Sequence, residues 1–298
     1  MKKKKKFDFT DVAIHIFCIL ASLACLIPLI LVISISLTSE AGIVEHGYTL
    51  IPSEFSTDAY RYVWASRATV LRAYGVTIFN AVVGTFFSVT CIALYAYALS
   101  RPNLMGKKFF TFYIFFTMLF SGGLVPWYMV CTQMLHIQNT VWAQIVPHLF
   151  NAWHCIILRT FIKSSVPDAI IESARIDGAG ELRTFVQIVL PIAIPGIATI
   201  ALFQVVFFWN DWWLALNLIS EPRFYNLQFL LQNMLANIQE LKAGGENLDA
   251  SAAIAAANIP AEGTRMALCM VALGPILVVY PFFQKYFIQG LTVGSVKG

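Results

Sequence analysis

A run of charged and small residues, 166–183, interrupts the otherwise apolar second half of a chain of 298 residues. Glu172, Arg175 and Asp177 are followed by Gly178, and on a helix Glu172 can pair with Arg175 three positions later. Charged and small residues together suit a groove on another protein, because small residues let two backbones approach closely. The pattern therefore indicates binding of this segment to another protein. A solvated helix lying on a membrane surface explains the same residues equally well.

A second candidate site combines aromatic rings with an amide and a carboxylate in the stretch FFWNDWW, residues 207–213. Sugar sites place aromatic faces against the C–H surface of the sugar and polar side chains against its hydroxyls. The candidate substrate contacts are Trp209, Asn210, Asp211 and Trp212. Trp and Tyr also collect at membrane interfaces without any ligand, and such an interfacial belt is the competing interpretation.

Polar residues recur at helical spacing upstream of this stretch, at Gln144, His148, Asn151 and His154. Intervals of four, three and three would place them on one face of a helix. That face would line a cavity or contact a neighbouring helix, so His148 and Asn151 join the candidate pathway residues.

No residue pattern indicates catalysis by this chain. The phosphate-binding pattern G-x-x-x-x-G-K-[ST] is missing, because Arg101 stands where a glycine should precede Gly106 and Lys107. The six cysteines lie in or beside apolar segments without a C-x-x-C pair, which is typical of core packing. We therefore expect a non-catalytic chain without a metal site or bound cofactor.

The composition indicates which elements must position these residues. With 58% hydrophobic and 12% charged residues, the chain is expected to be an all-α, polytopic membrane protein. Six apolar segments come close to the roughly 20 residues that cross about 30 Å of hydrocarbon as a helix. They cover residues 14–36, 75–99, 109–131, 141–158, 184–208 and 266–288.

The six spans divide the chain into a basic N-terminus (1–13), a first span with an outer segment (14–69), a core (70–290) and a tail (291–298). The core contains a loop at 163–183 and a long outer loop at 209–265. Fourteen of the 20 Lys and Arg residues fall on the side of the termini, which predicts that both termini are cytoplasmic. The net charge of +4 reflects this topology, and we predict no nucleic-acid partner.

Loop 163–183 is expected to contain a short helix. Ser165 can cap it, Pro167 suits its first position, and Asp168 complements the exposed N–H groups of the first turn. Gly178 should end it, because glycine adopts the left-handed conformation that closes helices.

Two of the predicted spans carry signals of a bend. Pro191 and Pro195 each remove a helical hydrogen bond from span 184–208, and SGGLVP at 121–126 interrupts span 109–131. The bends would mark pathway-lining helices, or they are ordinary kinks of membrane helices.

The stretch ESARIDGAGELRTFVQIVLP resembles the EAA signature of the membrane subunits of ABC importers, which reads E-A-A, three residues, G, nine residues, I-x-L-P. Every spacing is kept at Glu172, Ser173, Ala174, Gly178, Ile188, Leu190 and Pro191. The single departure is Ser173 in place of an alanine, which exchanges one small residue for another.

Further segments extend this resemblance over roughly residues 70–290. The layout of six spans and the segments AYGVTIFNAVVGT, ALSR and FFWNDWW are similar to carbohydrate permeases of the maltose-permease type, especially oligosaccharide permeases of Gram-positive bacteria. The resemblance implies a type I ABC importer permease fold in a bacterial plasma membrane, and import of a carbohydrate, an oligosaccharide above all, by alternating access.

The resemblance also implies partners and a role for the loop. The partners would be a second homologous permease subunit, a cytosolic ABC ATPase dimer that holds ATP and magnesium, an extracellular solute-binding protein and membrane lipid. The loop helix would be a coupling helix, in which Glu172 faces basic or polar groups of the ATPase and Gly178 gives the turn. The expected docking residues are Glu172, Ser173, Ala174, Arg175, Asp177, Gly178 and Ala179.

Other functions compete with this interpretation. Permeases for peptides, polyamines or amino acids share such a loop, so the cargo stays open. An ion-coupled secondary transporter would need acidic residues inside its spans, and the six predicted spans contain no Asp or Glu. A membrane-embedded enzyme would need clustered nucleophiles, bases or metal ligands, which the sequence does not offer.

Overall fold

The computed structural model describes residues 9–243 and 260–275, and every regular element in these ranges is a helix. One isolated β-bridge joins Thr38 to Phe55. The all-α prediction is therefore confirmed for the described residues. Predictions for the basic start, part of the outer loop, most of the sixth span and the tail lie outside them, at residues 1–8, 244–259 and 276–298.

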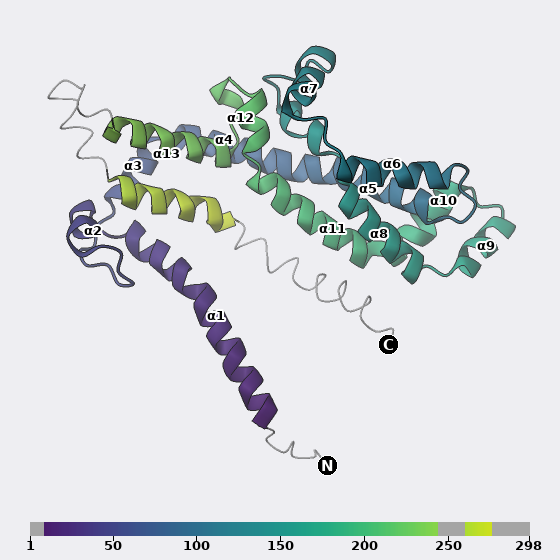
Figure 1. Ribbon diagram of the computed structural model, residues 1–298, viewed down its shortest axis with the longest axis horizontal. Helices are drawn as coiled ribbons and strands as arrows, with labels where there is room; N and C mark the ends of the chain where they lie inside the picture. Colours follow the sequence, from purple (N-terminus) through teal and green to yellow (C-terminus); the bar gives the residue numbers. More distant parts are fainter. Residues whose placement is uncertain (1–8, 244–259, 276–298) are drawn as a thin grey trace. The chain divides into compact units, whose positions relative to one another are not determined.

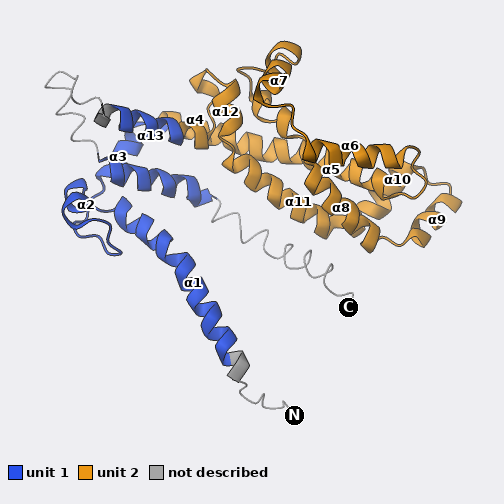
Figure 2. Cartoon of the chain, viewed as in Figure 1, with its two compact units in different colours: residues 1–67, 231–275 blue, residues 68–230, 276–298 orange. Residues whose placement is uncertain are grey.

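The chain divides into two compact units (Figure 2). Unit 1 comprises Met1–Arg67 and Leu231–Pro275, and unit 2 comprises Ala68–Leu230 and Ile276–Gly298. The boundary between them falls within helix α13 (Leu227–Ala243). All the predicted site residues belong to unit 2.

Unit 1 contains the first predicted span. Helix α1 (Phe9–Ser36) ends at the predicted residue and begins a little earlier than expected. It is followed by the short helices α2 (Glu40–His46) and α3 (Asp58–Ala65). Ser36 Oγ lies 2.9 Å from the hydroxyl of Tyr60, which fastens the end of α1 to α3 by a hydrogen bond. Large apolar side chains of α1 are exposed along its length, as expected of a helix whose surroundings are lipid or another subunit.

Two long helices form the frame of unit 2 (Figure 1). The first runs through α4 (Arg67–Phe79), a π turn (Asn80–Gly84) and α5 (Thr85–Ser100), for 34 residues in all. The second runs through α10 (Glu181–Thr184), a π turn (Phe185–Val189) and α11 (Leu190–Asn210), for 30 residues. Both match predicted spans, and the second passes through Pro191 and Pro195 without a break.

A glycine lets these two helices approach each other closely. A Cβ atom at Gly84 would lie 2.6 Å from Cζ of Phe208, which is 2% exposed. Nearby, the buried Gln204 side chain donates a hydrogen bond to Ser88 Oγ across the same pair of helices. The hydrogen bond pairs the amide nitrogen of Gln204 in the buried contact, while Gln204 Oε1 has no partner among the described residues.

Two predicted spans are not single helices. Segment 109–131 consists of α6 (Lys107–Leu119) and then α7 (Leu124–Met129) with a π turn (Val130–Met134), and the two parts meet at 114°. The turn occurs where the sequence places small residues, and Gly123 has a φ of +84° that favours glycine. The expectation of one continuous helix over 109–131 is therefore wrong, although SGGLVP correctly marked the bend.

Segment 141–158 is broken as well. It forms two 3₁₀ turns (Val141–Gln144 and Val146–His148), and then α8 (Ala152–Ser165) begins at an angle of 51°. Pro147 lies in the second turn, where it disfavours a continuous helix because it lacks an N–H group. The single polar face predicted for this span does not form.

Three helices of the described residues are long and apolar enough to cross a membrane alone, and the number is up to five if each bent pair is one span. The sixth predicted span, 266–288, begins in a helix over residues 261–275 and continues outside the described residues. The chain is thus an all-helical polytopic protein, with fewer unbroken spans than the apolar runs suggested.

Candidate functional site

The loop helix predicted from sequence is α9 (Asp168–Ile176), which lies at the end of unit 2 beside α10 (Figure 1). Its beginning differs slightly from expectation. Pro167 is the cap residue and has extended backbone angles, so the helix starts at Asp168. Ser165 does not cap it, because its hydroxyl has no hydrogen-bond partner and no side-chain cap exists at this end. The predicted capping role of Ser165 is therefore wrong.

The end of α9 is as predicted. Gly178 has a φ of +77°, in the left-handed region. The N–H of Ala179 donates to the carbonyl of Ala174 at 2.9 Å, and that of Gly178 donates to Arg175 at 3.0 Å. These two bonds are a Schellman motif, which satisfies carbonyls that the last helical turn leaves free. The glycine thus sets the direction in which the chain leaves α9.

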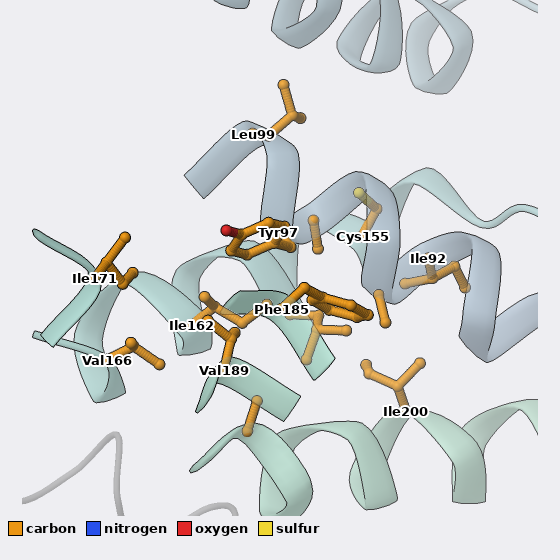
Figure 3. Close-up of a cluster of buried hydrophobic side chains, with 14 of the residues drawn as sticks. Ile92, Tyr97, Leu99, Cys155, Ile162, Val166, Ile171, Phe185, Val189 and Ile200 are labelled. Atoms are coloured by element: carbon orange, nitrogen blue, oxygen red, sulfur yellow. The ribbon is translucent and has the colours of Figure 1, made fainter. Parts of the chain in front are cut away.

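One face of α9 is anchored to unit 2. Ile171 and Ala174 are 4% and 6% exposed. Ile171 belongs to a hydrophobic cluster with Val166, Tyr97 and Phe185, which Figure 3 shows extending from the loop toward the long helices. Burial of this strip explains why an otherwise polar helix holds a fixed position. Ala174, predicted to dock, therefore contributes mainly to anchoring.

The remaining surface of α9 and of the turn after it is open. Glu172, Ser173, Arg175, Asp177 and Gly178 are exposed, as docking residues must be. Beside them, the apolar side chain of Ile176 is 87% exposed.

Sequence reasoning missed Ile176. The signal that could have found it is an isoleucine directly between two charged residues on the side opposite Ile171.

Polar contacts tie α9 to α5 and α10. Arg175 Nη2 donates to Glu181 Oε1 at 2.6 Å, and the hydroxyl of Tyr97 donates to Glu181 Oε2 at 2.7 Å. The hydrogen bond to Glu181 raises the pKa of Arg175, so the guanidinium stays charged. The ion-pair partner of Arg175 is Glu181, six residues further along the chain, and not Glu172 as predicted.

A buried arginine supports the start of α9. The side chain of Arg101, from the ALSR segment at the end of α5, is 7% exposed. Its Nη1 lies 3.7 Å from Asp168 Oδ1, and its guanidinium lies 5.2 Å from the ring centroid of Tyr97. Together Tyr97, Arg101 and Glu181 hold α9 from behind. None of the three was predicted, since their roles depend on contacts between distant segments.

The candidate pathway residues lie elsewhere in unit 2, and the structure brings two of them together. His148 Nε2 is 3.4 Å from Asp211 Oδ1, although the residues are 63 positions apart. The Asp211 side chain is 8% exposed, and its Oδ2 has no hydrogen-bond partner. Its main-chain carbonyl accepts a hydrogen bond from Asn226 Nδ2 at 2.7 Å. A buried carboxylate with a free oxygen is a polar group that a partner or substrate can satisfy.

The aromatic segment around Asp211 is divided between core and surface. Trp209 is 6% exposed, and its ring lies 6.3 Å from that of Tyr74. Asn210 donates its side-chain amide to the carbonyl of Val206 at 2.9 Å, within its own helix. Trp212 is 39% exposed. Of these, Trp212 is the ring available for stacking.

Asn151 has a structural contact of its own. Its side-chain oxygen accepts the N–H of His154 at 3.0 Å and thereby caps α8. It also lines a pocket of about 710 Å³. The aromatic residues of this pocket are Tyr95, Tyr113, Phe150 and Trp153. The pocket joins rings and an amide, which is the combination that the sequence suggested for residues 207–213.

Comparison with known proteins places this arrangement in context. A family model described as the inner membrane component of binding-protein-dependent transport systems matches residues 89–293. The chain is 38% identical to the polygalacturonan/rhamnogalacturonan transport system permease protein of Bacillus subtilis, over 97% of this chain and 98% of that protein. It is 26% identical to the melibiose/raffinose/stachyose import permease protein of the same organism, over 84% of each.

A solved structure has a similar fold. It is the crystal structure of a bacterial ABC transporter involved in the import of the acidic polysaccharide alginate. The TM-score is 0.79 at 27% identity, and the match covers 95% of this chain and 100% of the other.

Proposed function

Since this chain belongs to the inner membrane components of binding-protein-dependent transport systems, we propose that it carries an oligosaccharide into a bacterial cell by alternating access. Membership makes it a non-catalytic, multi-pass permease subunit of an ABC importer, which works with an ATPase and a binding protein. A second homologous permease subunit completes the proposed transmembrane pair.

The coupling element of the proposed mechanism is α9, docked in a cleft of the cytosolic ATPase dimer. One observation carries this assignment: Ile171 is buried on one face while Ile176 is 87% exposed on the other. An isoleucine this exposed, beside the charged residues of the signature, offers a docking partner an apolar contact that burial would stabilise. The anchored face transmits displacement of α9 to the long helices of unit 2.

The energy of coupling must come from the whole exposed face. Moving a gate from 1:99 to 99:1 requires about 5.5 kcal/mol of differential binding. A single exposed ion pair supplies only about 0–1 kcal/mol, so Glu172 cannot act alone. Ile176 adds an apolar contact, and a fully buried isoleucine contributes about 1.5–3 kcal/mol.

Ile176→Asp tests the coupling role. The aspartate would place an unpaired charge in the proposed interface, so the ATPase should be lost when the complex is purified in detergent. Val44→Asp is the control, because Val44 is 81% exposed and lies in the predicted outer segment. Retention of the ATPase by the Ile176 variant at the level of the Val44 variant would contradict docking through α9.

The proposed cargo is an oligosaccharide, supported by the substrates named for two relatives, polygalacturonan/rhamnogalacturonan and melibiose/raffinose/stachyose. The proposed contacts are the ring of Trp212, the pair of His148 and Asp211, and the aromatic pocket beside Asn151. Uptake of labelled galacturonan, raffinose-type and maltodextrin oligosaccharides by cells with and without the gene for this chain identifies the cargo. Unchanged uptake of all three, with loss of peptide or amino-acid uptake, would reject a carbohydrate importer.

Both termini and α9 are proposed to be cytoplasmic, on the basis of the excess of Lys and Arg on that side. Single cysteines introduced at Asp177 and at Val44 of a cysteine-free chain test this orientation. A membrane-impermeant maleimide added to intact cells should label the Val44 position alone. Labelling of the Asp177 position in intact cells would show that α9 lies outside the cell, which is the reverse of the proposed orientation.

A further inference from the structure

A groove of about 770 Å³ runs along one face of α6. Most of its walls come from α6, at the helical spacing of Lys108, Phe112, Phe116 and Phe120. Arg159 of α8 joins at the end where α6 begins. The groove therefore has a basic mouth and an apolar length.

The apolar length of the groove is a column of aromatic rings. The ring centroids of Phe112 and Phe116 are 6.0 Å apart, and those of Phe116 and Phe120 are 4.6 Å apart. The three side chains are 65%, 44% and 62% exposed. Rings that contact one another along a helix and stay open on the outer side form a continuous apolar surface of the kind that accommodates an acyl chain.

The length of the groove fits one leaflet of a bilayer. α6 has 13 residues, which corresponds to roughly 20 Å, whereas the hydrocarbon core is about 30 Å thick. The helix ends just before the chain turns by 114°. A molecule lying along α6 from its basic mouth therefore spans the headgroup boundary and the hydrocarbon of a single leaflet.

The mouth of the groove is cationic, and Asp168, which acts on Lys107 from outside the lining, is itself paired with Arg101. Lys107, Lys108 and Arg159 line it, and none of its nine lining residues is acidic. Lys107 Nζ donates to the carbonyl of Arg101 at 2.7 Å, and Arg159 Nε donates to the carbonyl of Leu99 at 3.3 Å. These bonds to neutral carbonyls orient the side chains but leave their charge in place. The complementary ligand carries a negative charge.

We propose that the α6 groove binds an anionic phospholipid, with its phosphate at Lys108 and Arg159 and an acyl chain along Phe112, Phe116 and Phe120. Basic pockets of this kind on the cytoplasmic side of membrane helices recognise anionic headgroups. The leaflet rests on the proposed orientation, in which this end of α6 is cytoplasmic. Binding itself depends on neither cargo nor nucleotide, so it can be tested separately from the proposed transport function.

The test is native mass spectrometry of the full transporter complex, purified in mild detergent and exchanged into defined mixtures of phosphatidylglycerol and phosphatidylcholine. The wild-type complex should retain phosphatidylglycerol in preference to phosphatidylcholine. The double variant Lys108→Gln, Arg159→Gln should bind phosphatidylglycerol roughly 30-fold more weakly, because each basic group near the headgroup contributes about a fivefold factor. Lys108→Gln alone should show part of the loss.

Arg183→Gln is the matched control. Arg183 is an exposed cation of α10 that does not line the groove, and its side chain bonds to Gln187. It should retain the lipid at the wild-type level. Equal retention by the double variant and the control, or equal retention of both lipids by the wild type, overturns the proposal. Efficient cross-linking of Phe116→Cys to the second permease subunit also overturns it, by showing that protein covers the groove.

The two proposals can be tested separately. The double variant Lys108→Gln, Arg159→Gln should lose lipid but retain the ATPase, and Ile176→Asp should lose the ATPase but retain lipid. A complex in which the Ile176 variant behaves as wild type while lipid selectivity persists would reject the coupling assignment and leave the lipid site standing.

Discussion

The two candidate regions of unit 2 are built in opposite ways. At the coupling end, Pro167, Ile171, Ile176 and Gly178 act within twelve consecutive residues, and a local helix with a Schellman end organises them. At the pathway region, His148 and Asp211 meet across 63 positions. The difference explains why a short sequence signature identified the first and only a list of polar and aromatic residues indicated the second.

The two regions also differ in how their polar groups are satisfied. Beside α9, Arg175 and Tyr97 each bond to one oxygen of Glu181, so both oxygens of that carboxylate have a partner. At Asp211, one carboxylate oxygen has no partner among the described residues. A carboxylate with both oxygens bonded suits a fixed structural support, and one with an unsatisfied oxygen suits a place where another molecule supplies the partner.

The largest effect is expected from a change in the frame that both regions share. Gly84→Ala would place a Cβ 2.6 Å from the buried ring of Phe208 and should lower the free energy of unfolding by up to about 3 kcal/mol. Gly75→Ala is the control, since nothing lies within 4 Å of its Cβ position in the same helix. Thermal unfolding in detergent measures both. Equal melting temperatures would show that α5 and α11 do not need this close approach.

The next largest effect is expected at the pathway region, and it should leave binding of the ATPase unchanged. Asp211→Ala removes the buried carboxylate beside His148 and should cost about 2 kcal/mol of stability, because it leaves neighbouring polar groups unpaired. Uptake of oligosaccharide should fall while the ATPase stays bound. Asp211→Asn keeps an acceptor at Oδ1 and should recover most of the uptake. Loss of the ATPase from the alanine variant would mean that the two regions are not independent.

A smaller effect is expected at the turn after α9. Gly178→Ala forces an alanine to a φ of +77° and should cost about 1 kcal/mol, whereas Gly180→Ala has ordinary backbone angles and open space around its Cβ. Substrate-stimulated ATP hydrolysis in proteoliposomes should decrease for the first variant alone. If the two alanine variants behave alike, the left-handed turn is not what orients α9.

The smallest effect should come from the glutamate of the signature. Glu172 is exposed, so Glu172→Ala should weaken coupling by less than about 1 kcal/mol and leave transport measurable. Uptake rates at several ATPase concentrations would reveal the reduced affinity. Complete loss of uptake would show that Glu172 contributes far more than an exposed charge can, and that docking does not rest on the whole face.

Much of the coupling end could be predicted from the sequence. Position and length of α9 followed from proline, charge and glycine within one short segment, and the structure moved its start by a single residue. The predicted docking set needed two adjustments, since Ala174 faces inward and Ile176 outward. Both depend on which side of α9 meets unit 2, and a three-turn helix with apolar residues on two sides does not reveal that.

The broken spans show a different limit of sequence reasoning. Apolar composition correctly located segments 109–131 and 141–158, because any chain in hydrocarbon must bury its polar backbone in helices. It could not show that they bend by 114° and 51°. Gly123 and Pro147 permit the bends, but packing against neighbouring helices decides whether a permitted bend occurs.

The sequence by itself determined that this protein is a helical membrane permease with a short polar helix, α9, between two apolar segments. The length of an apolar segment and the fixed spacing of a motif are properties of consecutive residues. They can therefore be recognised without knowledge of any tertiary contact. The tertiary structure alone decided that Tyr97, Arg101 and Glu181 support α9, that His148 meets Asp211, and that Arg159 joins the phenylalanine column of α6. Each of these depends on side chains brought together by helix packing, whose geometry is not encoded in any one segment.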